Sequence, residues 1–248
     1  MSEAQNLVKN VSVYLSSEVL SRAMSFVLII MLARHLGDTG LGKYSFIFAF
    51  VGLFSIISDF GISALMTREV ARNKLMTEKY VANVLAFKVL LSIFTTLLPT
   101  LFIIFTDKSP EIKIGIFLAG ISQSFYYLVY PFRTVFNAHE KQFYHSMYLL
   151  IERIIAFILG ITVLYMGYGL LGFIIVLVLS NFAGFIYGYF MVSRKFSKVT
   201  FELDIFFLKD ALKKSLPFWF TTIFMTIYFK IDTVMLGFMK GFEATGWY

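Results

Sequence analysis

Long apolar runs, separated by short polar segments, follow one another along the whole chain. Each run holds about 20 mostly apolar residues, the length at which an α-helix rising ~1.5 Å per residue crosses ~30 Å of hydrocarbon. The runs lack the alternation of polar and apolar positions that is typical of membrane barrel strands. The pattern therefore predicts an all-α integral membrane protein with about seven transmembrane helices. These are expected at residues 12–36, 42–66, 80–106, 111–137, 144–166, 169–193 and 216–239.

Lys and Arg residues are unevenly divided between the polar segments. Most of them precede the first run or follow the even-numbered runs, and fewer follow the odd-numbered runs. Because Lys and Arg accumulate in cytoplasmic loops, this bias predicts a cytoplasmic N-terminus in a multi-pass protein of the cell membrane. Two of the cytoplasmic segments, TREVARNKLMTEK and SRKFSKVTFELDIFFLKDALKKS, are basic and amphipathic. They are typical of helices on an anionic membrane surface, and a docking surface for another protein is the alternative.

The composition agrees with lipid as the main solvent of the chain. Hydrophobic residues make up 58% and charged residues 15% of the sequence, whereas a soluble domain contains about 25% charged residues. The net charge of +7 lies in short loops, which is typical of membrane orientation and argues against a nucleic-acid partner. The chain has no cysteine, its three histidines are scattered, and no nucleotide-binding fingerprint is present. We therefore expect no metal, no cofactor and no enzymatic activity.

A weak internal repeat relates the ends of the first and seventh runs. Residues 31–44 are MLARHLGDTGLGKY and residues 235–248 are MLGFMKGFEATGWY. The identical pairs are Met31 and Met235, Leu32 and Leu236, Gly37 and Gly241, Gly42 and Gly246, and Tyr44 and Tyr248. A repeat of six spans would place two halves in the same orientation, around an axis along the membrane normal.

The repeat predicts three parts of the chain. Residues 1–193 would form a first bundle of about six helices, residues 194–215 a basic amphipathic cytoplasmic linker, and residues 216–248 the first helix of a second bundle. Pro217 is expected at the start of that helix, because proline is favoured in the first helical turn. The chain stops where an eighth span should begin, which we interpret as truncation of the second bundle.

Three segments carry a resemblance to a known family: LARHLGDTGLGKYSF, ISDFGISALMTREVAR and YFKIDTVMLGFMKGFEATGWY. In their order and spacing they resemble the polysaccharide flippases of the multidrug/oligosaccharidyl-lipid/polysaccharide exporter superfamily, over essentially the whole chain. The resemblance implies two helical bundles arranged as a V around a central cavity. It also implies the substrate, an oligosaccharide linked to a polyprenyl (pyro)phosphate that is turned from the inner to the outer leaflet by alternating access. The implied partners are membrane lipid and the glycosyltransferases and polymerase of the same pathway.

Charged residues within the apolar runs are costly in hydrocarbon, so they must face protein or water. Glu18 and Arg22 are spaced i, i+4 and share one helix face, where they can form an ion pair. Charges at similar depth on the fifth and seventh runs indicate a polar cavity whose cations suit a phosphate. The predicted substrate-binding residues are Glu18, Arg22, Glu152, Arg153, Lys230 and Asp232, with Asp59, Lys88, Gln123 and Asn181 as further candidates.

These charges also have structural interpretations. The ion pair of the first run is alternatively a lock between helices. Lys88 lies near one end of its run and is expected to extend its ammonium to the interface. Asp59 is expected to meet Arg68 or Arg72 near the end of the second run.

Other functions compete with the flippase. A drug or cation extrusion antiporter would need carboxylates without cationic partners, whereas acidic and basic residues are balanced within the runs. A non-transporting membrane accessory subunit is the second alternative, and the length of the chain favours it. A membrane glycosyltransferase is disfavoured, because the sequence contains no aqueous domain with paired carboxylates for a metal and a sugar nucleotide.

Overall fold

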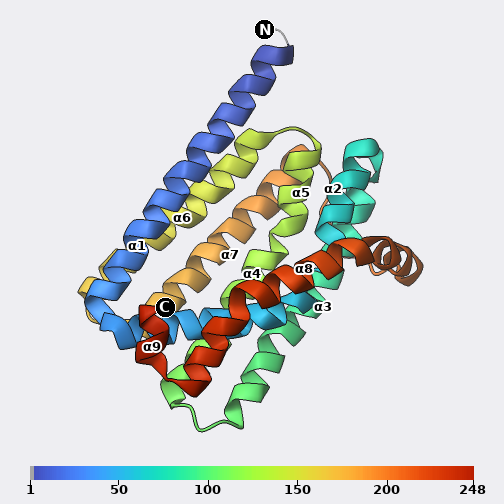
Figure 1. The fold of residues 1–248 in the computed structure, drawn as a ribbon. Coiled ribbons are helices and arrows are strands. Elements are labelled where there is room, and N and C mark those ends of the chain that lie inside the picture. Colours follow the sequence, from blue (N-terminus) through green and yellow to red (C-terminus); the bar gives the residue numbers. More distant parts are fainter. Residues whose placement is uncertain (1–2) are drawn as a thin grey trace.

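The computed structural model describes residues 3–248, with side chains from residue 12 onward, and every regular element in this part is a helix (Figure 1). The helices are α1 (Glu3–Phe54), η1 (Ser55–Ser58), α2 (Ile62–Arg72), η2 (Lys74–Met76), α3 (Thr77–Ile104), α4 (Pro110–Leu128), α5 (Tyr130–Ala138), α6 (Gln142–Tyr165), α7 (Gly169–Lys195), α8 (Ile205–Met239) and α9 (Phe242–Trp247). The predicted all-α class is therefore confirmed.

Six helical segments of the described residues are long and apolar enough to cross a membrane, where the sequence predicts about seven. The difference lies in α1, which contains the first two predicted spans in one helix that is kinked at Gly37. Gly37 has φ 66° and ψ −175°, a backbone conformation that is essentially restricted to glycine. The two arms of α1 thus replace two separate helices.

Two predicted spans are interrupted near one end. The span predicted at 42–66 is helical to Phe54, continues as η1, and then turns at Asp59–Gly61 before α2 begins. Gly61 has φ 71°, and a Cβ there would lie 2.7 Å from the Ser215 carbonyl oxygen, so the turn requires glycine. The span predicted at 111–137 is divided at Val129 into α4 and α5.

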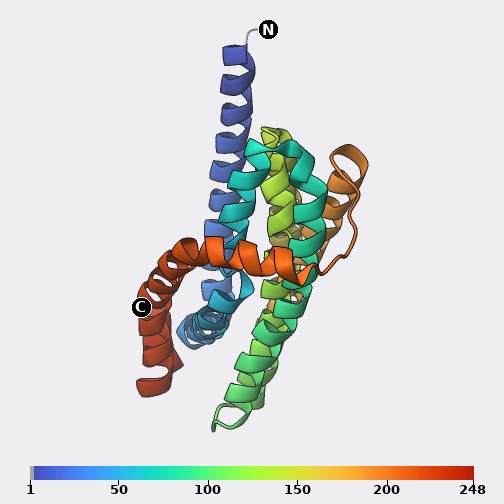
Figure 2. The same cartoon turned by 90° about the vertical axis from the view of Figure 1, so that its right-hand side faces the viewer.

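Helix α8 begins at Ile205, before the predicted start at residue 216. Asp204 caps it by accepting a hydrogen bond from the Phe207 backbone N–H at 3.0 Å. That bond and the ammonium of Lys79 hold the pKa of Asp204 below its usual value. Pro217 was expected at a helix start and lies inside α8 instead, where it has no N–H to donate to the preceding turn. Helix α8 curves along its length (Figure 2).

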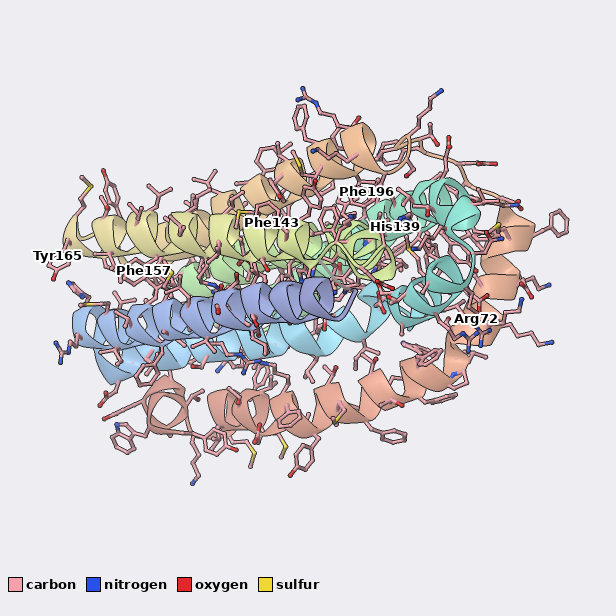
Figure 3. The ribbon with its side chains drawn as sticks, turned by 90° about the horizontal axis from the view of Figure 1, so that it is seen from above. Arg72, His139, Phe143, Phe157, Tyr165 and Phe196 are labelled. Atoms are coloured by element: carbon pink, nitrogen blue, oxygen red, sulfur yellow. The ribbon has the colours of Figure 1, made fainter. Side chains whose placement is uncertain are left out.

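The long helices lie side by side (Figure 1), and the bundle they form has two ends. Arg72, His139 and Phe196 lie toward one end, which we call the basic end, and Tyr165 lies at the opposite end (Figure 3). Gly37 shares the end of Tyr165, since the rings of His35 and Tyr165 are 4.8 Å apart, and we call this the kink end.

The repeated sequences adopt the same turn and touch each other at the kink end. Gly241 has φ 87° and ψ −178°, matching Gly37. A Cβ on Gly42 would lie 1.6 Å from the Phe242 carbonyl oxygen, and one on Gly246 would lie 2.1 Å from the Asp38 carbonyl oxygen. These contacts join equivalent positions of the two copies, so α9 packs on α1 with local twofold symmetry. The division of the chain into bundles remains a prediction.

Candidate functional site

The first predicted pair lies on the N-terminal arm of α1. Arg22 Nε is 3.0 Å from Glu18 Oε1, so the ion pair expected from the i, i+4 spacing is present. The Arg22 side chain is 79% exposed, so the pair lies on the surface of this chain. Because lipid solvates charges poorly, this face is expected to border water or protein in the membrane.

The second pair, Glu152 and Arg153, is on α6 and is more deeply placed. Arg153 Nη2 lies 3.5 Å from Glu152 Oε1, and only 7% of the Glu152 side chain is exposed. Arg153 Nε is buried and has no hydrogen-bond partner among the described residues. Such a donor is expected to find a water or ligand acceptor.

Contacts along α1 and α6 show how the two pairs are related. The rings of Tyr14 and His145 are 5.1 Å apart, and a Cβ on Gly160 would lie 3.0 Å from a Leu28 methyl carbon. The two helices therefore run parallel, and Arg22 and Arg153 lie at nearly the same level between these contacts. The two pairs on the first and fifth predicted runs thus lie at a similar level, and the matching depth of Lys230 and Asp232 on the seventh stays a prediction.

A third arginine, Arg133 of α5, lies nearer the basic end, beside His145, and was not among the predicted site residues. Its guanidinium carbon lies 4.9 Å from the Tyr130 ring centroid and 5.6 Å from that of Tyr148. Rings at this distance attract a cation and hold its plane. No ion pair of Arg133 is found in residues 12–248.

His145 connects Arg133 to Asn137. Arg133 Nε donates to His145 Nε2 at 3.1 Å, so that nitrogen carries no proton. The proton therefore lies on Nδ1, which donates to Asn137 Oδ1 at 2.9 Å. A cavity of about 200 Å³ adjoins this chain of hydrogen bonds, and we call it the arginine pocket. It is lined by Ser63, Ala64, Thr67, Tyr130, Arg133, Thr134 and Asn137.

A stripe of polar side chains could have revealed Arg133 in the sequence. Tyr126, Tyr130, Arg133 and Asn137 follow one another at the spacing of one helix face. The helix break at Val129 shifts the face only slightly, so the four residues stay on one side.

Lys230 and Gln123, both predicted, line a second cavity of about 240 Å³ between α1, α4 and α8. Gly52 forms part of its wall, with the Lys230 Cε 3.6 Å from the position of a Cβ there. Asp232 lies apart from this cavity lining, and its carboxylate accepts hydrogen bonds from the Tyr248 hydroxyl and the Thr233 N–H. We call this cavity the Lys230 pocket.

Asp59 and Lys88 form a buried ion pair. Lys88 Nζ lies 2.5 Å from Asp59 Oδ1 and also donates to the Ser58 carbonyl at 3.3 Å. The expected partners of Asp59, the arginines of α2, are therefore wrong, because the turn after η1 directs its carboxylate toward α3. The expectation that Lys88 reaches the interface is also wrong, since it is 2% exposed.

Asn181 joins helices within the bundle. Its Nδ2 donates to Ser122 Oγ at 2.9 Å, which links α7 to α4, and the residue is 8% exposed. Polar side chains that bond across helices in this way stabilise membrane bundles. A role of Asn181 in substrate binding stays a prediction.

Comparisons with known proteins agree with the resemblance found in the sequence. The model of a family described as polysaccharide biosynthesis protein matches residues 7–248. The fold is similar to that of a multidrug resistance MATE family transporter of the MOP superfamily, solved in an inward-facing conformation, with a TM-score of 0.63 and 17% identity. The alignment covers 94% of this chain and 58% of that transporter, so the chain spans less than two thirds of its length. The comparison with curated proteins gives no match. At this identity the likeness shows the fold, and it confirms the predicted fold class.

Proposed function

The chain belongs to the polysaccharide biosynthesis protein family, and from this membership and its buried cations we propose that it moves lipid-linked oligosaccharides across a membrane. The substrate carries a phosphate or pyrophosphate head, which is turned from the inner to the outer leaflet while the lipid tail stays in hydrocarbon. The protein is a multi-pass protein of the cell membrane, with its N-terminus and its basic end on the cytoplasmic side.

One observation carries this proposal, the excess of positive charge among partly buried side chains of α5 and α6. Arg153 pairs with Glu152, and Arg133 has no ion pair in residues 12–248. Two guanidinium groups against one carboxylate leave one positive charge among these helices. A partly buried charge of this kind needs a counter-ion, and an anionic head group supplies one.

The Lys230 pocket supports alternating access. It lies where α8 meets α1 and α4, and Lys230 has no ion pair in the described part of the chain. When α8 moves relative to α1 during transport, the ammonium of Lys230 would stay close to the phosphate head group. Glycosyltransferases and a polymerase of the same pathway are the partners that would supply and consume such a substrate.

The alternative functions agree less well with these charged side chains. Export of organic cations requires a carboxylate that is free to bind the drug, whereas Asp59 and Glu152 already hold Lys88 and Arg153, and Asp232 accepts hydrogen bonds from Tyr248 and Thr233. An accessory subunit without transport would not need an unbalanced charge among its helices.

Transport of a fluorescent lipid-linked oligosaccharide in proteoliposomes tests the proposal. The fraction of label that a membrane-impermeant quencher reaches should rise with time for the wild-type protein. Arg153→Gln should slow this rise, and Arg72→Ala should leave it unchanged because Arg72 is 70% exposed at the basic end. Efflux of an organic cation without movement of the labelled lipid would refute the proposal.

A further inference from the structure

The arginine pocket presents hydrogen-bond donors that nothing in the described structure uses. Arg133 donates its Nε–H to His145, and its terminal amino groups make no hydrogen bond to a carboxylate or carbonyl in residues 12–248. One of these groups faces the Tyr126 hydroxyl, a neutral acceptor that also accepts a bond from Tyr130. The remaining N–H groups of the Arg133 fork are available to an anionic acceptor.

The Asn137 amide provides a second donor in the pocket. Because His145 Nδ1–H donates to Asn137 Oδ1, the NH₂ group of Asn137 points away from the histidine. Asn137 lines the arginine pocket and also a neighbouring cavity of about 250 Å³ with Tyr14, Gln142 and His145. Its NH₂ group has no partner among the described side chains and so can donate to a ligand.

Thr134 provides a third donor. Its hydroxyl oxygen lies 3.4 Å from that of Thr67, whose single proton goes to the Ser63 carbonyl at 2.9 Å, so a ligand oxygen competes for the Thr134 proton only with this long contact. Thr67 donates to the Ser63 carbonyl and Ser63 donates to Asp59, so these two hydroxyls are already occupied. The lining of the pocket contains no carboxylate that would compete for Arg133.

The geometry of these donors selects the class of ligand. A carboxylate has two coplanar oxygens, which the guanidinium fork alone can satisfy. A phosphoryl group has further oxygens out of that plane, which suit the separate hydroxyl of Thr134 and amide of Asn137. The rings of Tyr130 and Tyr148 hold the guanidinium in place before the ligand arrives.

We propose that Arg133, Thr134 and Asn137 bind a phosphoryl group at the basic end of the bundle. The site is distinct from the level of Arg22 and Arg153, because His145 lies about two turns, or ~10 Å, before Glu152 on α6. This inference rests on the proposed function: the pocket is the site where the carrier phosphate of the lipid-linked sugar first binds. Free inorganic phosphate satisfies the same donors, so the two sources must be separated by experiment.

Calorimetric titration of the purified protein in a maltoside detergent, which contains no phosphate, tests the site. One arm uses inorganic pyrophosphate and the other a polyprenyl phosphate added to the micelles. Arg133→Lys keeps the charge and loses the fork, so binding should weaken about tenfold. Thr134→Val keeps the shape and loses the donor, so binding should weaken by about three- to tenfold. Arg72→Ala, which removes an exposed arginine at the same end, should bind as the wild type does.

The outcomes separate this site from the proposed function. Binding of either probe that depends on both Arg133 and Thr134 supports the site, and tighter binding of the polyprenyl phosphate identifies the lipid head as its source. Wild-type affinity in Arg133→Lys and Thr134→Val, or equal loss in Arg72→Ala, would overturn it. If the site binds phosphate but labelled lipid does not move in proteoliposomes, the site stands and the proposed function falls.

Discussion

The contact between the two copies of the repeat should not tolerate a methyl group. A Cβ on Gly42 would lie 1.6 Å from the Phe242 carbonyl oxygen and 2.9 Å from the Gly246 nitrogen. Carbon–oxygen contacts rarely fall below ~3.3 Å, so α9 must withdraw from α1 by about 1.7 Å. Both partners are backbone, so no side chain can rotate to relieve the clash. Overpacking of this kind costs about 1–3 kcal/mol.

We expect Gly42→Ala to open the kink end. The chain has no cysteine, so a single reporter can be placed at Thr245, which is 2% exposed in the contact. A Thr245→Cys protein should react slowly with a maleimide, and the added Gly42→Ala should speed the reaction. A loss of about 1.4 kcal/mol from the contact corresponds to a tenfold increase in the open fraction. Gly246→Ala should act in the same direction, since its Cβ would lie 2.1 Å from the Asp38 carbonyl oxygen.

Gly52→Ala is the matched control on the same helix. Its Cβ would make an ordinary contact of 3.6 Å with the flexible side chain of Lys230, and alanine favours the helix by up to about 1 kcal/mol. Labelling of Thr245→Cys should therefore stay at the reference rate with Gly52→Ala. An unchanged rate in Gly42→Ala, or an equal rise in Gly52→Ala, would refute the reasoning from the backbone contact.

Three further predictions concern charged groups. Asp59→Asn or Lys88→Met alone should lower the free energy of unfolding, measured in denaturant, by about 3–5 kcal/mol, because each leaves one buried charge unpaired. The double variant should recover most of this loss. Equal losses in all three variants would contradict the prediction. Arg22→Ala should reduce transport of the labelled lipid at unchanged membrane level, and adding Glu18→Gln should not restore it; restoration would mean that the pair is structural. Burial and two neighbouring lysines lower the pKa of His139, so the unfolded chain binds a proton that the folded chain does not as the pH falls through ~6.5. The melting temperature should fall on acidification and fall less in His139→Gln, and parallel curves would show that His139 contributes nothing.

The sequence predicts those features that depend on local pattern. Apolar run length indicates the membrane-crossing helices, because the bilayer sets that length, and i, i+4 spacing indicates the Glu18–Arg22 pair. The repeat indicates Gly37 and Gly241, which adopt matching conformations. Each of these depends on neighbours within a few turns of one helix.

Features that depend on distant contacts were missed. The Asp59–Lys88 pair joins a turn to another helix, and no local pattern distinguishes Lys88 from the arginines of α2 as the partner of Asp59. Arg133 gains its place from Tyr148 and His145 on α6, which lie beyond the next loop. Loop charge and cavity charge look alike in a sequence, because both are single cations at the edge of an apolar run.

Helix α8 is attached through η1 and the turn after it at one end, and through α9 packed on α1 at the other, and the Lys230 pocket lies between these attachments. Toward the basic end, Ser215 Oγ donates to the Phe60 carbonyl at 2.7 Å and Trp219 Nε1 donates to the Ile56 carbonyl at 2.9 Å. Each such bond contributes about 0.5–1.5 kcal/mol and can be exchanged for water. At the kink end the attachment is close backbone packing through glycine, which is lost as soon as the surfaces separate. The two attachments therefore respond to different changes: loss of a donor at Ser215 or Trp219 weakens the hydrogen-bonded end, whereas a methyl group on Gly42 or Gly246 weakens the packed end.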